Sequence, residues 1–261
     1  MNDKKTKIIL ICALLVAFGV LAVYVAIIYH PSPTIVSPST TEETGNTDET
    51  AKDQIPSPIT DKDYSEFYNQ IISASAENGN VGDHVRGNTK ARVVIIEYAD
   101  LQCPGCATLM LYMSNLYKKN SDNVAFIFRH YPLSIHPNAG LAAVATESAG
   151  MQGYFWEMTE TLYSTQGTWA NKTGDDLKNA FISTFKKIAP NGDVDKFAAN
   201  LENDNFTTKV TFDHELGSLY HHVNATPSVY VNGKAYNITD YKSYSDFSKA
   251  VQAEIDRILS K

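Results

Sequence analysis

The chain has little cysteine and no surplus of positive charge. Its 261 residues contain three cysteines, and 29 acidic against 22 basic side chains give a formal net charge of −7. Binding to nucleic acid requires a basic face, so this balance gives no support for that class of function. We find no internal repeat, and the length suggests one sizeable domain plus appendages.

A second cysteine pair is also missing. Cys103 and Cys106 stand two residues apart in "DLQCPGCATLM", and the only other cysteine is Cys12. A structural zinc site takes four ligands, and neither a second CxxC nor a suitably spaced histidine pair is there to complete one. A structural disulfide across so short a loop would constrain the unfolded chain little. Both of these alternatives are disfavoured, and the pattern favours thiol–disulfide exchange.

Charged residues are absent from the apolar run Ile8 to Tyr29. As a helix this run would be about 33 Å long, enough to cross a hydrocarbon core of roughly 30 Å. Lysines precede it and nothing basic follows for a long stretch, so residues 1–7 are expected in the cytoplasm and the rest of the chain outside. A cleaved signal peptide is the alternative, but the apolar core is long and no good small-x-small cleavage site follows. We therefore expect residues 8–29 to be a transmembrane anchor.

Large apolar residues are scarce in residues 30–61, which are rich in proline, serine, threonine and acidic side chains. Such a segment cannot bury enough surface to offset its ordering entropy. It is predicted to be a flexible, disordered stalk. The folded domain is then predicted to span residues 62–261.

The folded part begins with alternating signals for helix, loop and strand. Residues 63–76, "DYSEFYNQIISASA", have helical apolar spacing and predict a short amphipathic helix, and residues 78–91 are predicted to be a loop. Two β-branched runs, Arg92 to Asp100 and Asn123 to Tyr131, predict buried strands. Apolar residues recur at helical spacing between them: Leu109, Met110, Met113, Leu116 and Tyr117.

The cysteine pair falls at the amino end of this predicted helix. Unpaired backbone N–H groups and the positive end of the helix dipole lie there. Both favour the thiolate over the thiol at the first cysteine, and the thiolate is the nucleophile in disulfide exchange. The strand–helix–strand context therefore supports redox chemistry at Cys103.

Three separate stretches, in this order, resemble a DsbA-like member of the thioredoxin superfamily. They are residues 83–106, ending in "CPGC", residues 128–166, beginning "FRHYPLSIHPNAG", and residues 224–234, "NATPSVYVNGK". The resemblance implies an α/β thioredoxin fold with a helical insertion at about residues 137–222. It also implies an enzyme, a protein thiol–disulfide oxidoreductase.

The resemblance assigns roles to residues of this sequence. Cys103 would be the exposed attacking cysteine, and Cys106 the more buried resolving cysteine that closes the Cys103–Cys106 disulfide. Pro227 would be the cis-proline facing the pair, leaving the backbone of Thr226 free to pair with an extended substrate segment. Pro104 and Gly105 would contact substrate and tune the thiolate.

Glu97 is a further candidate, because related proteins carry an acidic residue at this position. It could relay a proton to or from the second cysteine, since a carboxylate in an apolar strand is costly unless it is paired. The alternative is a structural ion pair with Lys90 or Arg92. His130 and His136 flank the next segment, and a structural role for His130 is favoured over one at the active site.

The middle of the chain is predicted to be helical. Its helices are expected within residues 139–152, 153–166, 173–189, 194–204 and 205–223. An aromatic set there is predicted to be core, with a groove for unfolded substrates as the alternative: Tyr154, Phe155, Trp156, Met158, Leu162 and Tyr163. A hairpin turning at Asn232-Gly233 and a last helix over residues 244–261 follow.

Three classes of function compete. The first is an oxidase that donates its disulfide to exported cysteine-containing proteins and is recycled by a membrane redox partner. The second is a reductase or isomerase, and the third is a redox-inactive binding module, which the intact cysteine pair disfavours. Gly105 and Thr226 depart from the strongest oxidases, which often carry histidine and valine there. No metal and no cofactor beyond the disulfide are expected, and we interpret the four N-x-S/T sequons as chance occurrences in a prokaryotic protein.

Overall fold

The computed structural model describes residues 64–65 and 68–261. These lie in the second of two units into which the chain divides, Gln54–Lys261, and the first unit is Met1–Asp53. The predicted anchor, residues 8–29, and the predicted stalk, residues 30–61, lie outside the described residues. Within the described part, none of the helices has the length and apolar character needed to cross a membrane.

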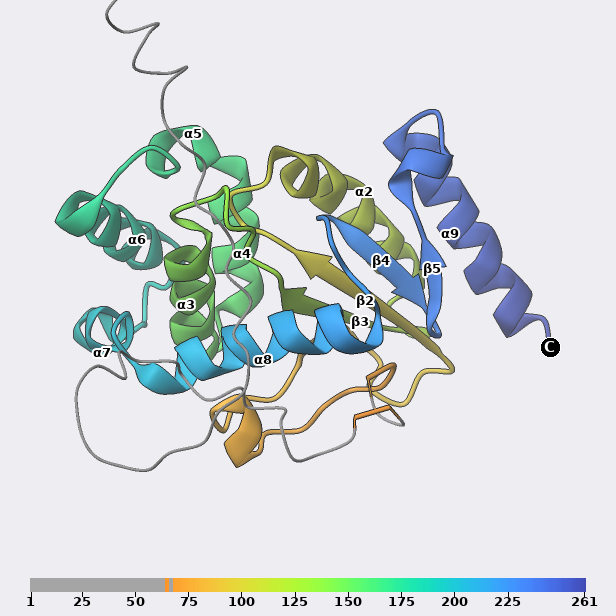
Figure 1. Ribbon diagram of the computed structural model, residues 1–261, viewed down its shortest axis with the longest axis horizontal. Helices are drawn as coiled ribbons and strands as arrows, with labels where there is room; N and C mark the ends of the chain where they lie inside the picture. The colour runs from red at the N-terminus through yellow and green to blue at the C-terminus, as the bar shows by residue number, and fades with distance from the viewer. Residues whose placement is uncertain (1–63, 66–67) are drawn as a thin grey trace, which may run out of the picture. The chain divides into compact units, whose positions relative to one another are not determined.

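The domain is built on a mixed sheet of five strands in the order β1-β3-β2-β4-β5 (Figure 1). The central strands β2 and β3 are parallel, and every other neighbouring pair is antiparallel. The strands are β1 (His84–Gly87), β2 (Val93–Ala99), β3 (Val124–His130), β4 (Ser228–Val231) and β5 (Lys234–Tyr236). The two predicted strands are thus confirmed as the parallel pair at the centre.

The helices follow the predicted order closely. Pro104–Asn120 forms α2 between the parallel strands, and Tyr244–Leu259 forms α9 at the end of the chain. The helical insert contains α3 (Ala139–Gly150), α4 (Phe155–Ser164), α5 (Gln166–Trp169), α6 (Gly174–Ile188), α7 (Val194–Asn200) and α8 (Asp204–Tyr220). Two short 3-10 helices are η1 (Ala76–Asn78) and η2 (Ile238–Asp240).

Different helices pack against the two faces of the sheet. On one face Val93 and Ile95 of β2 pack in a cluster with residues of α2 and α9. On the other face Ile96 and Tyr98 form a second cluster, and α8 crosses that side (Figure 1). Because side chains alternate along a strand, Glu97 points to the same face as Val93 and Ile95, beneath α2. The sheet register therefore directs this carboxyl group toward the helix that carries the cysteines.

A fully buried ion network lies on the α8 side of the sheet. The guanidinium of Arg129 donates to Asp83 Oδ2 at 2.8 Å and to the Tyr98 hydroxyl at 3.1 Å. Lys209 of α8 lies 3.3 Å from Asp83 and 2.6 Å from Asp213. Each buried charge thus has an opposite charge in contact, which offsets its desolvation. The network joins β3, α8 and the segment before β1.

The helix predicted over residues 63–76 is wrong for the described residues, which form turns and extended chain up to η1. Their backbone groups bind partners far along the chain. Arg129 donates to the carbonyl oxygens of Tyr68 at 2.6 Å and Gln70 at 2.8 Å, and the Ile72 N–H donates to Asp83 at 2.9 Å. These long-range bonds replace the helical ladder.

Several short elements were not predicted from the sequence, among them β1 and α5. The stretch 78–91 was predicted to be a loop, but it contains β1, which pairs with β3 as an antiparallel edge strand. The helix α5 follows α4 almost directly. The aromatic set of α4 is largely core as predicted, because Phe155, Met158, Leu162 and Tyr163 are all buried.

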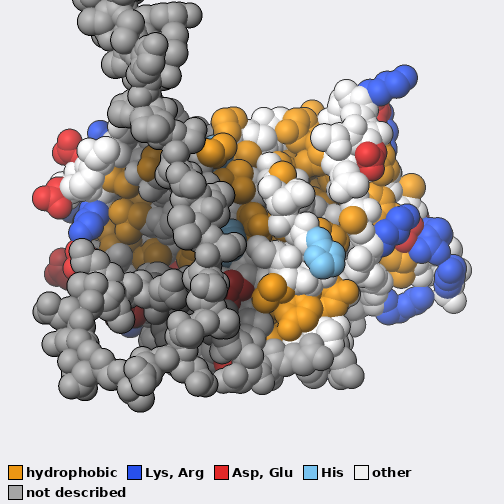
Figure 2. Space-filling view, in the orientation of Figure 1, with side chains coloured by type: hydrophobic (Ala, Val, Ile, Leu, Met, Phe, Trp, Pro, Cys, Tyr) orange, Lys and Arg blue, Asp and Glu red, His pale blue; other side chains and the backbone are white. Residues whose placement is uncertain are grey.

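The outer surface separates charged from uncharged regions on the face drawn in Figure 2. Acidic and basic side chains gather toward the two ends of the view, over α6 and α7 at one end and α9 at the other. The middle of this face carries mainly hydrophobic and uncharged side chains.

The buried network predicts a large penalty for removing one partner. Arg129→Met should lower the free energy of unfolding by about 3–5 kcal/mol, because Asp83 is left buried with less compensation. Lys178→Met is the matched control, since its partner Glu202 is 74% exposed, and it should change the free energy of unfolding little. Urea unfolding followed by circular dichroism measures both. Equal costs for the two variants would contradict a stabilising role for the network.

Candidate active site

The helix α2 begins at the cysteine pair. Cys103 is the N-cap residue with extended backbone angles, and Pro104 occupies the first helical position. Proline suits that position, because its fixed φ fits the helix and it has no N–H to leave unpaired. The backbone N–H groups of Cys106 and Gly105 help to lower the pKa of the Cys103 thiol. The expected placement of the pair at a helix amino terminus is confirmed.

Cys103 is a poised nucleophile. A hydrogen bond from the Cys106 thiol is the main cause that lowers the pKa of Cys103 from its ordinary value near 9 to about 5, against the opposing effect of burial. The sulfur also lies 3.6 Å from the carbonyl oxygen of Thr226. Its side chain is less open than the sequence suggested, since the residue is only 8% exposed. A substrate therefore reaches this sulfur through a narrow opening.

Cys106 has the opposite character. It is fully buried, and burial raises its pKa well above the ordinary value, with the Cys103 thiolate adding to the rise. The backbone N–H of Asp100 lies 3.5 Å from its sulfur. Both cysteines are free thiols in this structure. The pair thus combines one acidic sulfur, on a side chain that is largely covered, with one that holds its proton.

The loop before β4 faces the cysteines, as the sequence predicted. The peptide bond between Thr226 and Pro227 is cis. A Cβ atom placed on Gly105 would lie 3.4 Å from Pro227 Cδ and 3.3 Å from the hydroxyl of Tyr244. Gly105 therefore stands at the contact between α2, the cis-proline loop and the start of α9, where a larger side chain would have to displace a neighbour.

Glu97 lies in the core without a charged partner. It is fully buried, and neither carboxylate oxygen has a hydrogen-bond partner among the described residues. Burial, with the charge of Cys103, raises its pKa to about 8. The alternative of an ion pair with Arg92 is wrong, since that guanidinium donates to the carbonyl oxygen of Ile258 at 2.9 Å. Lys90 also makes no ion pair with it in the described part of the chain. Glu97 is thus a neutral acid at pH 7, able to give up a proton.

The two flanking histidines have structural partners. His130 is 1% exposed, and its Nε2 lies 2.9 Å from Glu147 of α3. His136 Nδ1 lies 2.7 Å from Asp100. The favoured structural interpretation of His130 agrees with these contacts. His136 acts on the loop before the cysteines through Asp100.

Three residues near the site were not predicted. Asp100 accepts hydrogen bonds from the N–H groups of Gln102 and Leu133 and so fixes the loop that carries the cysteines. Gln166 of α5 donates to the carbonyl oxygens of Leu101 at 2.7 Å and Cys103 at 3.1 Å. Tyr163 of α4 is buried with an unpartnered hydroxyl. The bonds of Gln166 and the bond between Asp100 and Leu133 join residues far apart in the chain, so no local sequence signal marks them.

The described ranges, 64–65 and 68–261, contain no group of three or more His, Cys, Asp or Glu side chains placed to hold a metal ion. The chemistry that these residues can perform without a cofactor is sulfur exchange. The Cys103 thiolate can attack or leave, the buried Cys106 thiol holds a proton, and the neutral carboxyl group of Glu97 lies beneath α2.

Comparison with known proteins identifies similar sequences and folds. A thioredoxin family model matches residues 79–253. A curated relative from Mycolicibacterium gilvum, the Na(+)/H(+) antiporter NhaA 1, is 32% identical over 157 residues, which are 59% of this chain and 24% of that protein. The chain spans about a quarter of the length of the curated relatives that it matches.

Solved structures share the architecture. BdbD from Bacillus subtilis in its oxidised form is similar with a TM-score of 0.58 and 22% identity, over 74% of this chain and 98% of that one. Wolbachia pipientis α-DsbA1 is similar with a TM-score of 0.52 and 21% identity, over 67% of this chain and 90% of that one. At these identities the likeness concerns the fold: a thioredoxin-like α/β domain with a helical insertion.

The hydrogen bond between the cysteines predicts a specific alkylation profile. In the reduced full-length chain carrying Cys12→Ser, iodoacetamide should label Cys103 first, with a rate that rises through about pH 5 and levels off near neutrality. Adding Cys106→Ala removes the donor and should move the midpoint upward, whereas Cys106→Ser keeps a donor and should move it less. Mass spectrometry of timed aliquots measures both. A wild-type midpoint near pH 8.5 would contradict the assignment.

The raised pKa of Glu97 predicts how stability depends on pH. The folded state holds this proton up to about pH 8, so its contribution is complete below the unfolded pKa near 4.5 and is lost as the pH rises through about 8. Glu97→Gln should therefore be about as stable as wild type at pH 4, and more stable by about 4 kcal/mol at pH 8.

The matched control is Glu157→Gln, on the exposed side of α4, which should change stability little at either pH. Urea unfolding at pH 4, 6 and 8 gives the comparison. A Glu97→Gln gain that is independent of pH would show that titration of this carboxyl group is not the cause.

Proposed function

The chain belongs to the thioredoxin family of thiol–disulfide oxidoreductases, with residues 79–253 matching the family, and from this membership we propose that it oxidises cysteines of exported proteins outside the cytoplasm. The observation that carries the proposal is the asymmetry of the cysteine pair. A Cys103 pKa of about 5 instead of 9 keeps this sulfur a thiolate at pH 7, which stabilises the dithiol form relative to the disulfide. That favours transfer of the disulfide to substrate.

The exchange proceeds in two displacements. A substrate thiolate attacks Cys103 Sγ, the Cys103–Cys106 bond breaks, and Cys106 leaves and takes a proton, for which Glu97 is the nearest proposed donor. A second substrate thiolate then attacks the substrate sulfur of the mixed disulfide. The substrate disulfide forms, and Cys103 leaves as a thiolate that is stable at neutral pH. Two electrons pass from the substrate to the cysteine pair.

The cis-proline loop is the proposed substrate platform. The backbone carbonyl of Thr226 lies beside Cys103 Sγ, at the point where an extended substrate segment would place its own backbone. Pairing with Thr226 would add the segment as a short strand and hold its cysteine in line with the sulfur. Pro104, Gly105 and Pro227 form the rest of the proposed contact surface.

The proposed location rests on the amino-terminal sequence. Residues 8–29 would anchor the chain in the membrane, residues 1–7 would stay in the cytoplasm, and residues 30–61 would hold the domain, from residue 62 onward, outside. The curated relatives are membrane antiporters by name, and similarity to a quarter of such a protein is compatible with a domain kept at the membrane. A membrane redox partner would reoxidise the cysteines, and no other cofactor is required.

The alternative is a reductase or isomerase that works from the dithiol form. Gly105 favours it, because this position supplies no side-chain donor to the Cys103 thiolate. Thr226 favours it as well, because the strongest oxidases tend to carry valine before the cis-proline. We place the reduction potential between the ~−120 mV of the strongest oxidases and the ~−270 mV of thioredoxin.

Equilibration of the full-length chain with glutathione buffers tests the direction. The dithiol fraction, read by alkylation and mass spectrometry, should give a potential between ~−120 mV and ~−270 mV. Gly105→His should raise it further, and Gly105→Ala is the control for steric effects at the same site. A wild-type potential at or below that of thioredoxin would overturn the oxidase assignment and favour the reductase.

Trapping identifies the partners. Cys106→Ser should accumulate mixed disulfides with Cys103 in cells, because the resolving thiol is missing, whereas Cys103→Ser should accumulate none. Exported proteins with paired cysteines among the trapped species support the oxidase. A single membrane reductant as the trapped species would support the reductase.

A further inference from the structure

The peptide group between Ala99 and Asp100 faces the buried cysteine. Its N–H lies 3.5 Å from Cys106 Sγ, and its carbonyl oxygen accepts the N–H of Tyr131 at 2.8 Å. The peptide plane is therefore held at one end by the chain that follows β3, and it meets the sulfur at the other end. Both cysteines are free thiols here, so this contact belongs to the state in which the Cys103–Cys106 bond is open.

The side chain of Asp100 is anchored at three points. Its Oδ1 accepts the N–H of Gln102 at 2.7 Å, and its Oδ2 accepts the N–H of Leu133 at 2.8 Å. His136 Nδ1 lies 2.7 Å from the same Oδ2. Because a carboxylate only accepts hydrogen bonds, Nδ1 carries the hydrogen in this contact and His136 is the donor. The carboxylate is fully buried, and these three donors offset the cost of its desolvation.

His136 is the part of this anchor that reaches solvent. Its side chain is 18% exposed. It borders a pocket of about 600 Å³, which His214 of α8 and Asn224 of the loop before β4 also line. Two hydrogen bonds therefore join an accessible side chain to the buried sulfur, one from His136 to the Asp100 carboxylate and one from the Asp100 N–H to Cys106.

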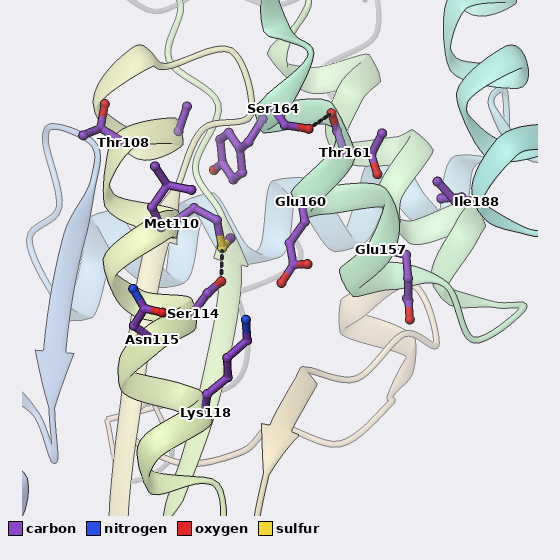
Figure 3. A pocket seen from close by; sticks show the side chains of 13 residues that line it. Thr108, Met110, Ser114, Asn115, Lys118, Glu157, Glu160, Thr161, Ser164 and Ile188 are labelled. Atoms are coloured by element: carbon purple, nitrogen blue, oxygen red, sulfur yellow. Dashed lines mark hydrogen bonds between the residues drawn. The ribbon is translucent and has the colours of Figure 1, made fainter.

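A larger pocket near the site has no such link. It has a volume of about 990 Å³ and lies between α2 and α4 (Figure 3). The Ser114 hydroxyl donates to Met110 Sδ there at 3.6 Å. Within the described part of the chain, no hydrogen bond runs from the side chains that line this pocket to either cysteine sulfur. Of these two pockets, the one beside His136 is thus the one that hydrogen bonds connect to Cys106.

The proposed exchange puts negative charge on Cys106. A substrate thiolate attacks Cys103 Sγ, the new S–S bond forms as the Cys103–Cys106 bond breaks, and the electron pair of the broken bond passes to Cys106 Sγ. Burial raises the pKa of Cys106 and so disfavours this charge, whereas the backbone N–H of Asp100 acts in the opposite direction. A fixed donor aimed at an atom that gains charge lowers the barrier, because it does not have to reorganise during the reaction.

We propose that the Asp100 N–H stabilises Cys106 as it leaves the disulfide, and that His136 is a positioning residue that holds this donor in place through the Asp100 carboxylate. The inference rests on the proposed function and adds to it a donor for the leaving sulfur. The N–H acts before the proton from Glu97 arrives and, in the reverse step, while the Cys106 thiolate attacks the mixed disulfide. It therefore accelerates opening and closing alike, whatever the net direction of electron flow.

His136→Ala tests the positioning role, in the full-length chain carrying Cys12→Ser. Glutathione should open the disulfide about fivefold more slowly than without the His136 change, because the donor is less well aimed. Closing, the release of glutathione from its mixed disulfide with Cys103, should slow by the same factor. The reduction potential should therefore stay unchanged. Acid quench and mass spectrometry resolve the dithiol, mixed-disulfide and disulfide forms and give both rate constants.

Two further variants separate this role from packing. His136→Asn places an amide N–H near the position of Nδ1, since each nitrogen is bonded to Cγ, and should bring both rates back to within about twofold of wild type. His214→Ala removes a histidine of the same pocket, one that stacks on Tyr131 rather than binding Asp100, and should behave as wild type. The rate of Cys103 alkylation should be the same in all three variants.

A spectroscopic measurement needs no change at His136. In the reduced full-length chain, Cys106→Ala removes the acceptor of the Asp100 N–H. The amide proton of Asp100 should then move upfield, because a hydrogen-bonded amide proton is deshielded, and Cys103→Ala should move it much less. Nuclear magnetic resonance of the ¹⁵N-labelled chain records both shifts. This comparison tests the donor even if His136→Ala does not fold.

Four results would overturn the inference. They are an opening rate for His136→Ala equal to that of His214→Ala, a loss of rate in one direction only that shifts the reduction potential, a His136→Asn chain as slow as His136→Ala, and an Asp100 amide proton that does not respond to Cys106→Ala. Each of them leaves the proposed oxidoreductase standing if the wild-type chain exchanges with glutathione. A wild-type chain that does not exchange would overturn the proposed function as well.

Discussion

One hydrogen bond, from the Cys106 thiol to the Cys103 sulfur, gives the two cysteines different roles. It is the main cause of the acidic Cys103, and it requires Cys106 to keep its proton. The helix start supplies further donors from the backbone of Gly105 and Cys106. The same bond makes the two displacements unequal, because one sulfur leaves readily as a thiolate and the other needs a proton. Glu97, which lies beneath α2, is the proposed source of that proton.

The two faces of the sheet divide stability from chemistry. On the α8 side, Arg129, Asp83 and Lys209 satisfy one another and tie distant segments together. On the α2 side, Glu97 is buried with no compensating charge in contact, at a cost to the folded state above its unfolded pKa. A polar group that could have been apolar at no loss to the fold is an argument for a use outside folding.

Local sequence patterns predicted the parts of the site that local physics fixes. The β-branched run of β2, the apolar spacing of α2 and the cysteines at its start all follow from neighbours in the chain. The cis bond at Pro227 was expected only from the resemblance. The failures share a long-range cause. Residues 68–72 were predicted to be helical because their bonds to Arg129 and Asp83 cannot be seen from neighbouring residues. Gln166 likewise binds the backbone of Leu101 and Cys103 from the helical insert. Whether a single hydroxyl group, such as that of Tyr163, is buried depends on which helices pack against it, and the local sequence does not show this.

The uptake of protons and the uptake of electrons by the site are linked through Glu97. In the reduced state the Cys103 charge raises the pKa of this carboxyl group, and oxidation removes that charge. Between about pH 5 and about pH 8 the dithiol form therefore holds the proton of Cys106 and tightens the hold of Glu97 on its own. Uptake of one proton with two electrons lowers the reduction potential by ~30 mV for each pH unit. Partial uptake of a second proton, by Glu97, makes the potential fall more steeply with pH. A substrate dithiol releases two protons when it is oxidised, whereas the pair takes up fewer than two. The potential of the substrate therefore falls faster with pH than that of the pair, and the preference of the pair for oxidising substrates strengthens as the pH rises toward the pKa of the substrate thiols.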